Sequence, residues 1–345
     1  MKKAWVQSPF LKACRLEKAP YTPVWLMRQA GRYMKEYRAI RDRVPFLALC
    51  KNPDLVTEVT VNAQEKIGAD AAIIFSDILL IVEPLGLKLN YLKGDGPSIS
   101  AVKTAGDVEA LSEADPKKSL SFVYRAIRQT RGALKAGIPL IGFAGAPFTL
   151  ASYMIEGGSS DSFVKTRKFM RTDGAVWKIL MEKITAATIL HLEAQIEAGV
   201  QAVQLFDSWV GCLSVEEYKK YALPFSKKVI KGLKNQVPVI HFGTNTGHFL
   251  EEFACAGSEV VGVDHRIELD DAWKRIGHKK AIQGNLDPRA LLKNIKTIKK
   301  HVRKILDSVK ERPGHIFNLG HGVLPETPVE NVIALVEIVH EYKIE

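Results

Sequence analysis

The sequence lacks the features that would place it in a membrane or in a disulfide-rich class. No apolar run approaches the roughly 20 residues needed to cross a bilayer, and no signal-like apolar segment follows the lysines near the start. The cysteines lie far apart and form no C-x-x-C pair, which argues against a disulfide framework and a thiolate zinc cluster. We therefore expect a cytoplasmic protein with no membrane partner and no bound metal. The four cysteines are Cys14, Cys50, Cys212 and Cys255.

Nucleotide-binding loops are also missing. The glycines near Gly142 and Gly145 do not form G-x-G-x-x-G, and no G-x-x-x-x-G-K-[ST] motif is present. Positive charge is abundant, since 49 lysines and arginines face 38 acidic residues, for a formal net charge of +11. Such an excess favours an anionic partner: a nucleic acid, a membrane surface or an acidic small molecule. No nucleic-acid motif or basic stripe with interleaved aromatics is present, so nucleic-acid binding is kept only as an alternative.

The chain does contain a repeating pattern of apolar runs and helical segments. Eight short runs show little alternation, as expected of strands buried on both faces; they cover residues 24–27, 71–75, 139–143, 202–206, 237–242, 259–263, 281–283 and 315–319. Strands alternating with helices imply parallel crossovers of the α/β class. Eight units favour a single (β/α)8 TIM barrel over an open doubly wound sheet. We expect one domain over residues 1–345, with an N-terminal extension (1–22) and a hairpin inserted after the second strand (85–100, around Gly94-Asp95-Gly96).

Local signals predict two helix starts. Asp54, directly after a proline, is predicted to cap a helix whose apolar stripe continues to residue 67. Thr327 opens a capping-box pattern that would place Pro328 at the first helical position.

Small and ionisable residues follow the apolar runs. In TIM barrels the chemistry gathers where the strands end, at the carboxyl face. The residues at these positions are Arg28 to Arg32, Asp77, Gly145, Asp207, Ser208, Gly243, Asp264, Gly284, Asn285, Gly320 and His321. Residues chosen only for packing would be less polar, so this face is the predicted site.

The first of these loops carries two arginines. Arg28 and Arg32 directly follow a buried strand, and guanidinium groups match carboxylates and phosphates bidentately. The loop therefore suits a multiply anionic ligand, whereas Arg38 and Arg43 further along are expected on the solvated surface.

Three other side chains at this face are candidates for ligand contacts. Asp77 could stabilise a cation or accept N–H bonds from a ligand, or form a structural salt bridge. His321 lies between two glycines, which allow close approach to the backbone. Ser208 has no G-x-S-x-G surroundings, so we expect a hydrogen-bonding role and not a nucleophile. His191, by contrast, lies on an apolar helix stripe and is predicted to belong to the core.

Several of these segments resemble the motifs of the uroporphyrinogen decarboxylase family. P-V-W-L-M-R-Q-A-G-R-Y at residues 23–33 and G-F-A-G-A-P-F-T-L at residues 142–150 are similar to its two signatures. Further matches in family order are F-S-D-I-L (75–79), S-Y-M-I-E-G (152–157), F-D-S-W (206–209), G-N-L-D-P (284–288) and F-N-L-G-H-G (317–322). The resemblance spans nearly the whole chain.

This resemblance implies a fold, a reaction and a set of site residues. The family is a TIM barrel and usually a homodimer, uses no cofactor, and converts uroporphyrinogen III to coproporphyrinogen III in haem biosynthesis by removing CO₂ from four acetate side chains. By resemblance, Arg28 and Arg32 hold substrate carboxylates, and Asp77 accepts the pyrrole N–H groups. The remaining substrate-binding positions implied are Gln29, Ala30, Gly31, Arg41, Tyr153, Ser208 and His321.

The chemistry explains why a cofactor is not needed. Loss of CO₂ leaves an electron pair, and a pyrrole protonated at a ring carbon can take it up. The protein must then supply an acid and a counter-charge for the cation. We expect Asp77 to be the counter-charge and either Arg28 or Arg32 to be the proton donor.

A few positions depart from the family pattern. Phe148 stands where tryptophan is common, residues 241–245 are unusual, and His265 replaces an aromatic residue. Related barrels are zinc-dependent methyltransferases whose ligands include a His-x-Cys pair; here His241 is followed at that spacing by Gly243. A zinc methyltransferase is therefore the nearest alternative, although the cysteine ligand is missing.

Overall fold

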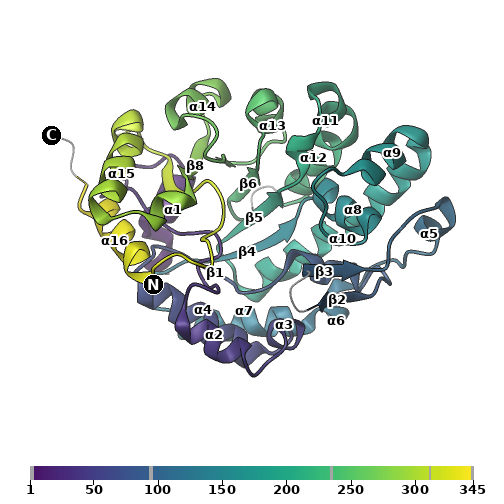
Figure 1. Ribbon diagram of the computed structural model, residues 1–345, viewed down its shortest axis with the longest axis horizontal. Helices are drawn as coiled ribbons and strands as arrows, with labels where there is room; N and C mark the ends of the chain where they lie inside the picture. Colours follow the sequence, from purple (N-terminus) through teal and green to yellow (C-terminus); the bar gives the residue numbers. More distant parts are fainter. Residues whose placement is uncertain (1–3, 93–95, 234–235, 311, 343–345) are drawn as a thin grey trace.

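A parallel sheet forms the centre of the molecule. The computed structural model describes residues 4–92, 96–233, 236–310 and 312–342. Within them, seven strands pair in parallel in the order β1-β4-β5-β6-β7-β8-β9. The strands are β1 (Ala72–Ile73), β4 (Leu140–Gly145), β5 (Ala202–Asp207), β6 (Val239–Gly243), β7 (Val260–Gly262), β8 (Ala281–Leu286) and β9 (His315–Leu319). All seven overlap the predicted runs, and helices surround them (Figure 1).

The first predicted strand joins the two edges of this sheet without forming a strand of its own. Val24 makes a parallel bridge to Phe317 of β9, and its carbonyl accepts the N–H of Asp70, just before β1, at 2.8 Å. Pairing stops there because the next N–H groups bond to side chains: Met27 N–H donates to Asn318 Oδ1 at 3.2 Å. The segment thus occupies the eighth position of the barrel.

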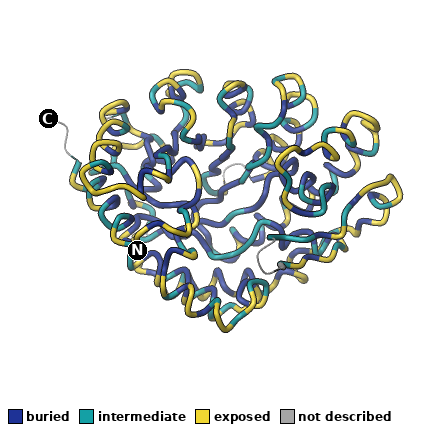
Figure 2. The backbone as a smooth tube through the Cα atoms, in the orientation of Figure 1, coloured by how far each residue is buried: buried dark blue, intermediate teal, exposed yellow. Residues whose placement is uncertain are grey.

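Helices cover the outside of the sheet. The main ones are α4 (Pro53–Ile67), α7 (Ser121–Ala133), α10 (Gly174–Ala198), α12 (Leu223–Gly232), α13 (Leu250–Ala254), α14 (Leu269–Ile276), α15 (Ile295–Val309) and α16 (Val329–His340). The first and last of these helices, α4 and α16, contact each other. Buried backbone concentrates on the strands and exposed backbone on the outer helix faces (Figure 2). The α/β TIM-barrel prediction is confirmed.

Eight further helices lie within the described residues. They are α1 (Pro9–Cys14), α2 (Lys35–Arg41), α3 (Phe46–Cys50), α5 (Ala105–Glu109), α6 (Pro116–Ser119), α8 (Pro147–Glu156), α9 (Val164–Thr172) and α11 (Val215–Tyr221). Five 3₁₀ turns lie within the described residues: η1 (Ala4–Gln7), η2 (Ile78–Val82), η3 (Val210–Cys212), η4 (Gly247–Phe249) and η5 (Pro288–Leu292). No helix within the described part of the chain is long and apolar enough to cross a membrane.

The hairpin predicted after the second apolar run (71–75) is present, and it follows β1, the strand formed by that run. β2 (Leu89–Leu92) and β3 (Gly96–Ile99) pair antiparallel. Two residues of the predicted turn, Gly94 and Asp95, lie outside the described residues. The hairpin is tied to the body, since Ile99 N–H donates to the carbonyl of Gly157 at 2.9 Å, directly after α8.

Both predicted N-caps, Asp54 and Thr327, are wrong, because a neighbouring residue caps each helix. The cap of α4 is Asn52, whose Oδ1 accepts the N–H groups of Asp54 and Leu55, while Asp54 lies in the first turn. α16 begins at Val329, with Pro328 as its N-cap and no side-chain cap bond. The asparagine cap allows Pro53 to occupy the first helical position, where its missing N–H costs nothing.

A chain of side-chain hydrogen bonds crosses the interior of the barrel. Trp25 Nε1 donates to Gln283 Oε1 at 2.9 Å, and Gln283 Nε2 donates to Gln204 Oε1 at 2.9 Å. All three side chains are buried. We call residues 24–27, which join the two edges of the sheet, the bridging segment. Because buried polar groups need partners, this chain of bonds fixes the bridging segment and thereby the loop that follows it.

Candidate active site

The loop after the bridging segment holds Arg28 in an unusual backbone conformation. Arg28 has φ of +60°, in the left-handed region that non-glycine residues seldom adopt. Its side chain lies against the loop after β9: a Cβ on Gly322 would sit 2.4 Å from Arg28 Cδ. Glycine at 322 is therefore required for this packing. Strained backbone of this kind often marks functional positions.

Asp77 carries a carboxylate that acts electrostatically on Arg28. It caps η2, with Oδ1 accepting Leu79 N–H at 2.7 Å and Oδ2 accepting the Tyr91 hydroxyl at 2.7 Å. Burial raises the pKa of Asp77, whereas the two hydrogen bonds and the positive charge of Arg28 lower it. Desolvation, followed by the charge of Arg32, lowers the pKa of Arg28. The structure thus brings Arg28, Arg32 and Asp77 into one electrostatic cluster.

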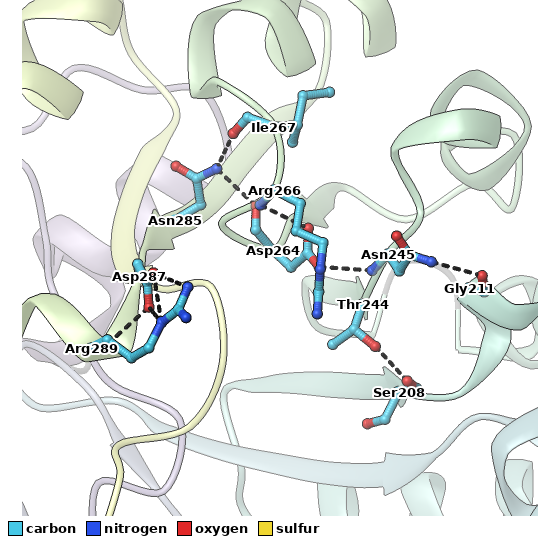
Figure 3. Close-up of polar contacts among 10 residues, drawn as sticks. All are labelled: Ser208, Gly211, Thr244, Asn245, Asp264, Arg266, Ile267, Asn285, Asp287 and Arg289. Carbon is cyan, nitrogen blue, oxygen red and sulfur yellow. Dashed lines mark hydrogen bonds and ion pairs between the residues drawn. The ribbon is translucent and has the colours of Figure 1, made fainter. Parts of the chain in front are cut away.

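Tyr153 of α8 lies close enough to this cluster to feel its charges, and Ser208 directly follows β5. Burial raises the pKa of Tyr153, and Asp77 and Arg28 are among the charges that act on it. The Tyr153 ring meets that of Trp209 edge-on, with centroids 5.7 Å apart. Ser208, directly before that tryptophan, accepts the Thr244 hydroxyl with its backbone carbonyl, and its own side chain points away from this contact (Figure 3). The Ser208 hydroxyl is therefore left for another partner.

His321, in the loop after β9, also lies within reach of the charge of Arg28. Desolvation of its ring, followed by the charge of Arg28, lowers its pKa, and His265 and Arg266 contribute to the same shift. The loops after β7 and β9 are in close contact, because a Cβ on Gly320 would lie 2.2 Å from the backbone nitrogen of His265. This packing brings a third guanidinium, that of Arg266, to the same face as Arg28.

Side-chain bonds connect the loops that follow β6 and β7 with each other and with strand β8 (Figure 3). Asp264 Oδ2 accepts Asn245 N–H at 2.8 Å and pairs with the Arg266 guanidinium. Asn285 Nδ2 donates to the carbonyls of Asp264 and Ile267 at 2.9 and 2.7 Å. The side chain of Arg266 is nevertheless 57% exposed, so it remains free to meet a ligand.

Four of the predicted site positions are engaged elsewhere. The Gln29 side chain is buried and accepts Leu26 N–H at 3.4 Å, and Gln29's own carbonyl accepts the Tyr33 hydroxyl at 2.6 Å. Arg41 donates to the Val44 carbonyl and lies over the Phe46 ring, 5.6 Å from its centroid. In the loop between Arg28 and Arg32, Ala30 lines a cavity of about 430 Å³ between α2 and α4, and the Gly31 carbonyl accepts Met34 N–H at 3.0 Å.

The residues present do not form the zinc site of the alternative reading. The His241 ring stacks on Phe253, with centroids 3.9 Å apart, and its Nε2 lies 3.4 Å from the buried carboxylate of Asp207. A side chain at Gly243 would meet Phe253 at 2.9 Å and Thr246 at 2.5 Å, so a cysteine ligand has no room there. Among the described residues, no group of three or more potential ligands is arranged to hold a metal.

Two residues of the cluster were missed from the sequence. Tyr91 lies on the hairpin, where nothing in the local sequence indicates contact with a residue 14 positions earlier. Arg266 follows the strand-end residue Asp264 by two positions, and a wider search of the strand ends would have found it.

His191, predicted to be a core residue, is buried and bonded through Nδ1 to the Tyr124 hydroxyl at 2.9 Å, which confirms that prediction.

Comparison with known proteins decides the family. The family model described as uroporphyrinogen decarboxylase (URO-D) matches residues 6–342. The chain belongs to the uroporphyrinogen decarboxylase family. It is 52% identical over 334 residues to the uroporphyrinogen decarboxylase of Carboxydothermus hydrogenoformans, with 96% of this chain and 95% of that protein covered. The protein of the same name from Solibacter usitatus is 49% identical, with 99% and 100% covered.

Membership in this family makes the chain an enzyme of the carboxy-lyase class. A solved methyltransferase structure from Methanosarcina mazei has the same fold, with a TM-score of 0.82 over 97% of this chain and 98% of that one. Its sequence identity is 20%, so this likeness shows the fold alone. The methyltransferase reading thus rests on shared architecture and not on the site.

Proposed function

We propose that this protein decarboxylates the four acetate side chains of uroporphyrinogen III to give coproporphyrinogen III in porphyrin and haem biosynthesis. The observation that carries the proposal is the cluster of Arg28, Arg32 and Asp77 at the carboxyl face of the barrel, in a chain of this family. One partly buried carboxylate among guanidiniums matches a ligand that has N–H donors at its centre and carboxylates at its edge.

The reaction uses the pyrrole ring as its own electron sink. A proton is added to the ring carbon beside the acetate-bearing position, which makes the ring an iminium-like cation. The bond between the acetate methylene and its carboxylate then breaks, CO₂ leaves, and the electron pair neutralises the ring. A proton on the exocyclic carbon gives the methyl group, and loss of the added ring proton restores the pyrrole. Since the substrate supplies the sink, no cofactor is part of the proposal.

Asp77 is proposed to stabilise the cation and to accept pyrrole N–H groups. An ionised carboxylate can accept about four hydrogen bonds, and Leu79 and Tyr91 use two of these positions. Capacity therefore remains on both oxygens for the ligand. A preorganised charge in a buried site acts more strongly than the same charge in water.

The cations are proposed to hold the substrate carboxylates. Arg28 and Arg32 would bind on one side of the centre, and one of them supplies the proton. Arg266, whose charge also acts on His321, is exposed and suits a further carboxylate. Tyr153, Ser208 and His321 are proposed to contact the bound macrocycle, and Gln29, Ala30, Gly31 and Arg41 are proposed as further substrate-binding positions.

Three further proposals concern the whole molecule. Residues 1–345 are proposed to form one domain, since the seven parallel strands belong to a single sheet and the family match runs over residues 6–342. By resemblance to the family we also propose a homodimer that works in the cytoplasm on a small-molecule substrate, with no nucleic-acid partner.

The test is an anaerobic incubation of the purified protein with uroporphyrinogen III. We expect coproporphyrinogen III together with intermediates that have lost one to three carboxylates. Oxidised uroporphyrin is the matched control, because it keeps the eight carboxylates but has no isolated pyrrole ring to protonate; it should bind without reacting. If uroporphyrinogen yields no product, the proposed function is wrong.

A further inference from the structure

Tyr91 reaches the centre of the site from the inserted hairpin. Its hydroxyl donates to Asp77 Oδ2 at 2.7 Å, while Leu79 N–H occupies Oδ1 at 2.7 Å. The backbone donor belongs to the same turn as the carboxylate. The tyrosine donor comes from β2, 14 residues later in the chain. One side-chain bond therefore connects the hairpin to the residue that carries the central charge.

The Tyr91 side chain is held in place by its own neighbours. Its ring meets the Phe46 ring of α3 edge-on, with centroids 4.6 Å apart. The Phe46 ring also contacts Phe75, two residues before Asp77, with centroids 6.1 Å apart. On the other strand of the hairpin, the bond from Ile99 fixes β3 to the end of α8. A hydroxyl on such a braced ring donates in one direction, which makes it suitable for orienting a carboxylate.

We propose that Tyr91 is a positioning residue of the decarboxylation, whose hydroxyl holds the Asp77 carboxylate turned toward the bound pyrroles. This inference rests on the proposed function. Two fixed donors, one on each oxygen, define the plane of the carboxylate and leave one acceptor position on each oxygen for the substrate. A single donor would let the group rotate.

The charges around Asp77 favour this role. Besides Tyr91 on β2, the titratable groups that act on it are Arg28 from the first loop, Tyr153 from α8 and Cys50 from α3. Burial raises the pKa of Tyr153 and that of Cys50, so both are uncharged near neutral pH. Burial also raises the pKa of Asp77, and the bonds from Leu79 and Tyr91 together with Arg28 oppose that rise. Loss of the Tyr91 hydroxyl should therefore raise the pKa of Asp77.

The chain contains a matched control. The Tyr21 hydroxyl donates to Asp70 Oδ1 at 2.9 Å, so a second tyrosine holds a second aspartate, which is buried. Asp70 precedes β1 and Asp77 follows it, which places the two aspartates at opposite ends of the barrel. Tyr21→Phe removes the same kind of bond away from the proposed site.

The experiment compares the pH dependence of kcat and kcat/KM in the wild type, Tyr91→Phe and Tyr21→Phe. The ionised form of Asp77 is the active one, so activity falls as pH drops through its pKa. In Tyr91→Phe the midpoint of this acid limb should move up by about one pH unit, the expected effect of one hydrogen bond to a charged group. Tyr21→Phe should keep the wild-type midpoint. An unchanged midpoint in a folded Tyr91→Phe protein would overturn the proposal.

A second measurement does not depend on activity. In protein labelled with ¹³C at the aspartate carboxyls, the Asp77 signal is identified by its loss in Asp77→Asn, and its titration midpoint should rise in Tyr91→Phe. If Tyr91→Phe does not fold, 3-fluorotyrosine at position 91 replaces it, because the stronger donor should move the midpoint down. No shift in either case refutes the role of Tyr91. A wild type that titrates as expected but does not decarboxylate refutes the proposed function instead.

Discussion

Replacement of Asp77 by asparagine separates its charge from its shape. The amide has nearly the same volume, and its oxygen can still accept Leu79 N–H, which now lies at 2.7 Å. The hydroxyl of Tyr91 must turn to accept where it formerly donated. What is lost is the negative charge facing the pyrrole cation. One preorganised electrostatic interaction of this kind contributes on the order of 3 kcal/mol to the transition state, which corresponds to about a hundredfold in kcat.

The assay is the initial rate of coproporphyrinogen formation under anaerobic conditions, measured over a range of substrate concentrations. We expect KM to change by only a few-fold, because the arginines still hold the carboxylates. Asp70→Asn is the control: Asp70 accepts Val24 N–H at 2.7 Å and the Tyr21 hydroxyl at 2.9 Å, so its loss should lower stability and leave kcat near the wild-type value. Near-normal turnover in Asp77→Asn would refute the counter-charge role.

Three other changes test the surroundings. Arg32→Gln should raise KM several-fold and weaken the dependence of kcat/KM on salt, whereas Arg171→Gln, which removes an exposed cation paired with a glutamate, should change neither. Gly322→Ala should lower kcat/KM about tenfold at nearly unchanged melting temperature, because its Cβ would lie 2.4 Å from Cδ of Arg28; a normal rate would show that the position of Arg28 is not critical. Burial lowers the pKa of His191 to about 4, below its value of about 6.5 in the unfolded chain. The unfolded state therefore binds more protons between these values, so Tm should fall as pH drops from 6.5 to 4, and fall less steeply in His191→Gln.

The strands of the sheet were predictable because their apolar runs are continuous. A strand covered on both faces needs apolar residues throughout, and this requirement is local. The bridging segment at Val24 satisfies the same requirement without forming a strand, because the N–H group of Met27 bonds to a side chain of β9. The start of α4 was misassigned for a similar reason: Asn52 and Asp54 are both capable caps, and only the backbone conformation chooses between them.

The candidate site was predictable to the extent that its residues follow strands. Arg28, Asp77, Ser208 and His321 all come directly after apolar runs, and a parallel barrel must bring such positions to one face. Arg41 comes from a helix, and its contacts are with Val44 and Phe46. Its placement near the substrate depended on resemblance alone.

By itself, the sequence determined the barrel, the carboxyl face at which the charged residues gather, and the arginine pair that opens it. These follow from patterns in which each residue's environment is set by near neighbours along the chain. Only the tertiary structure decided that Gly322 makes room for Arg28, that Arg266 comes to the same face, and that Tyr91 donates to Asp77. Contacts between distant segments depend on how the loops pack, and no local pattern in the chain encodes that packing.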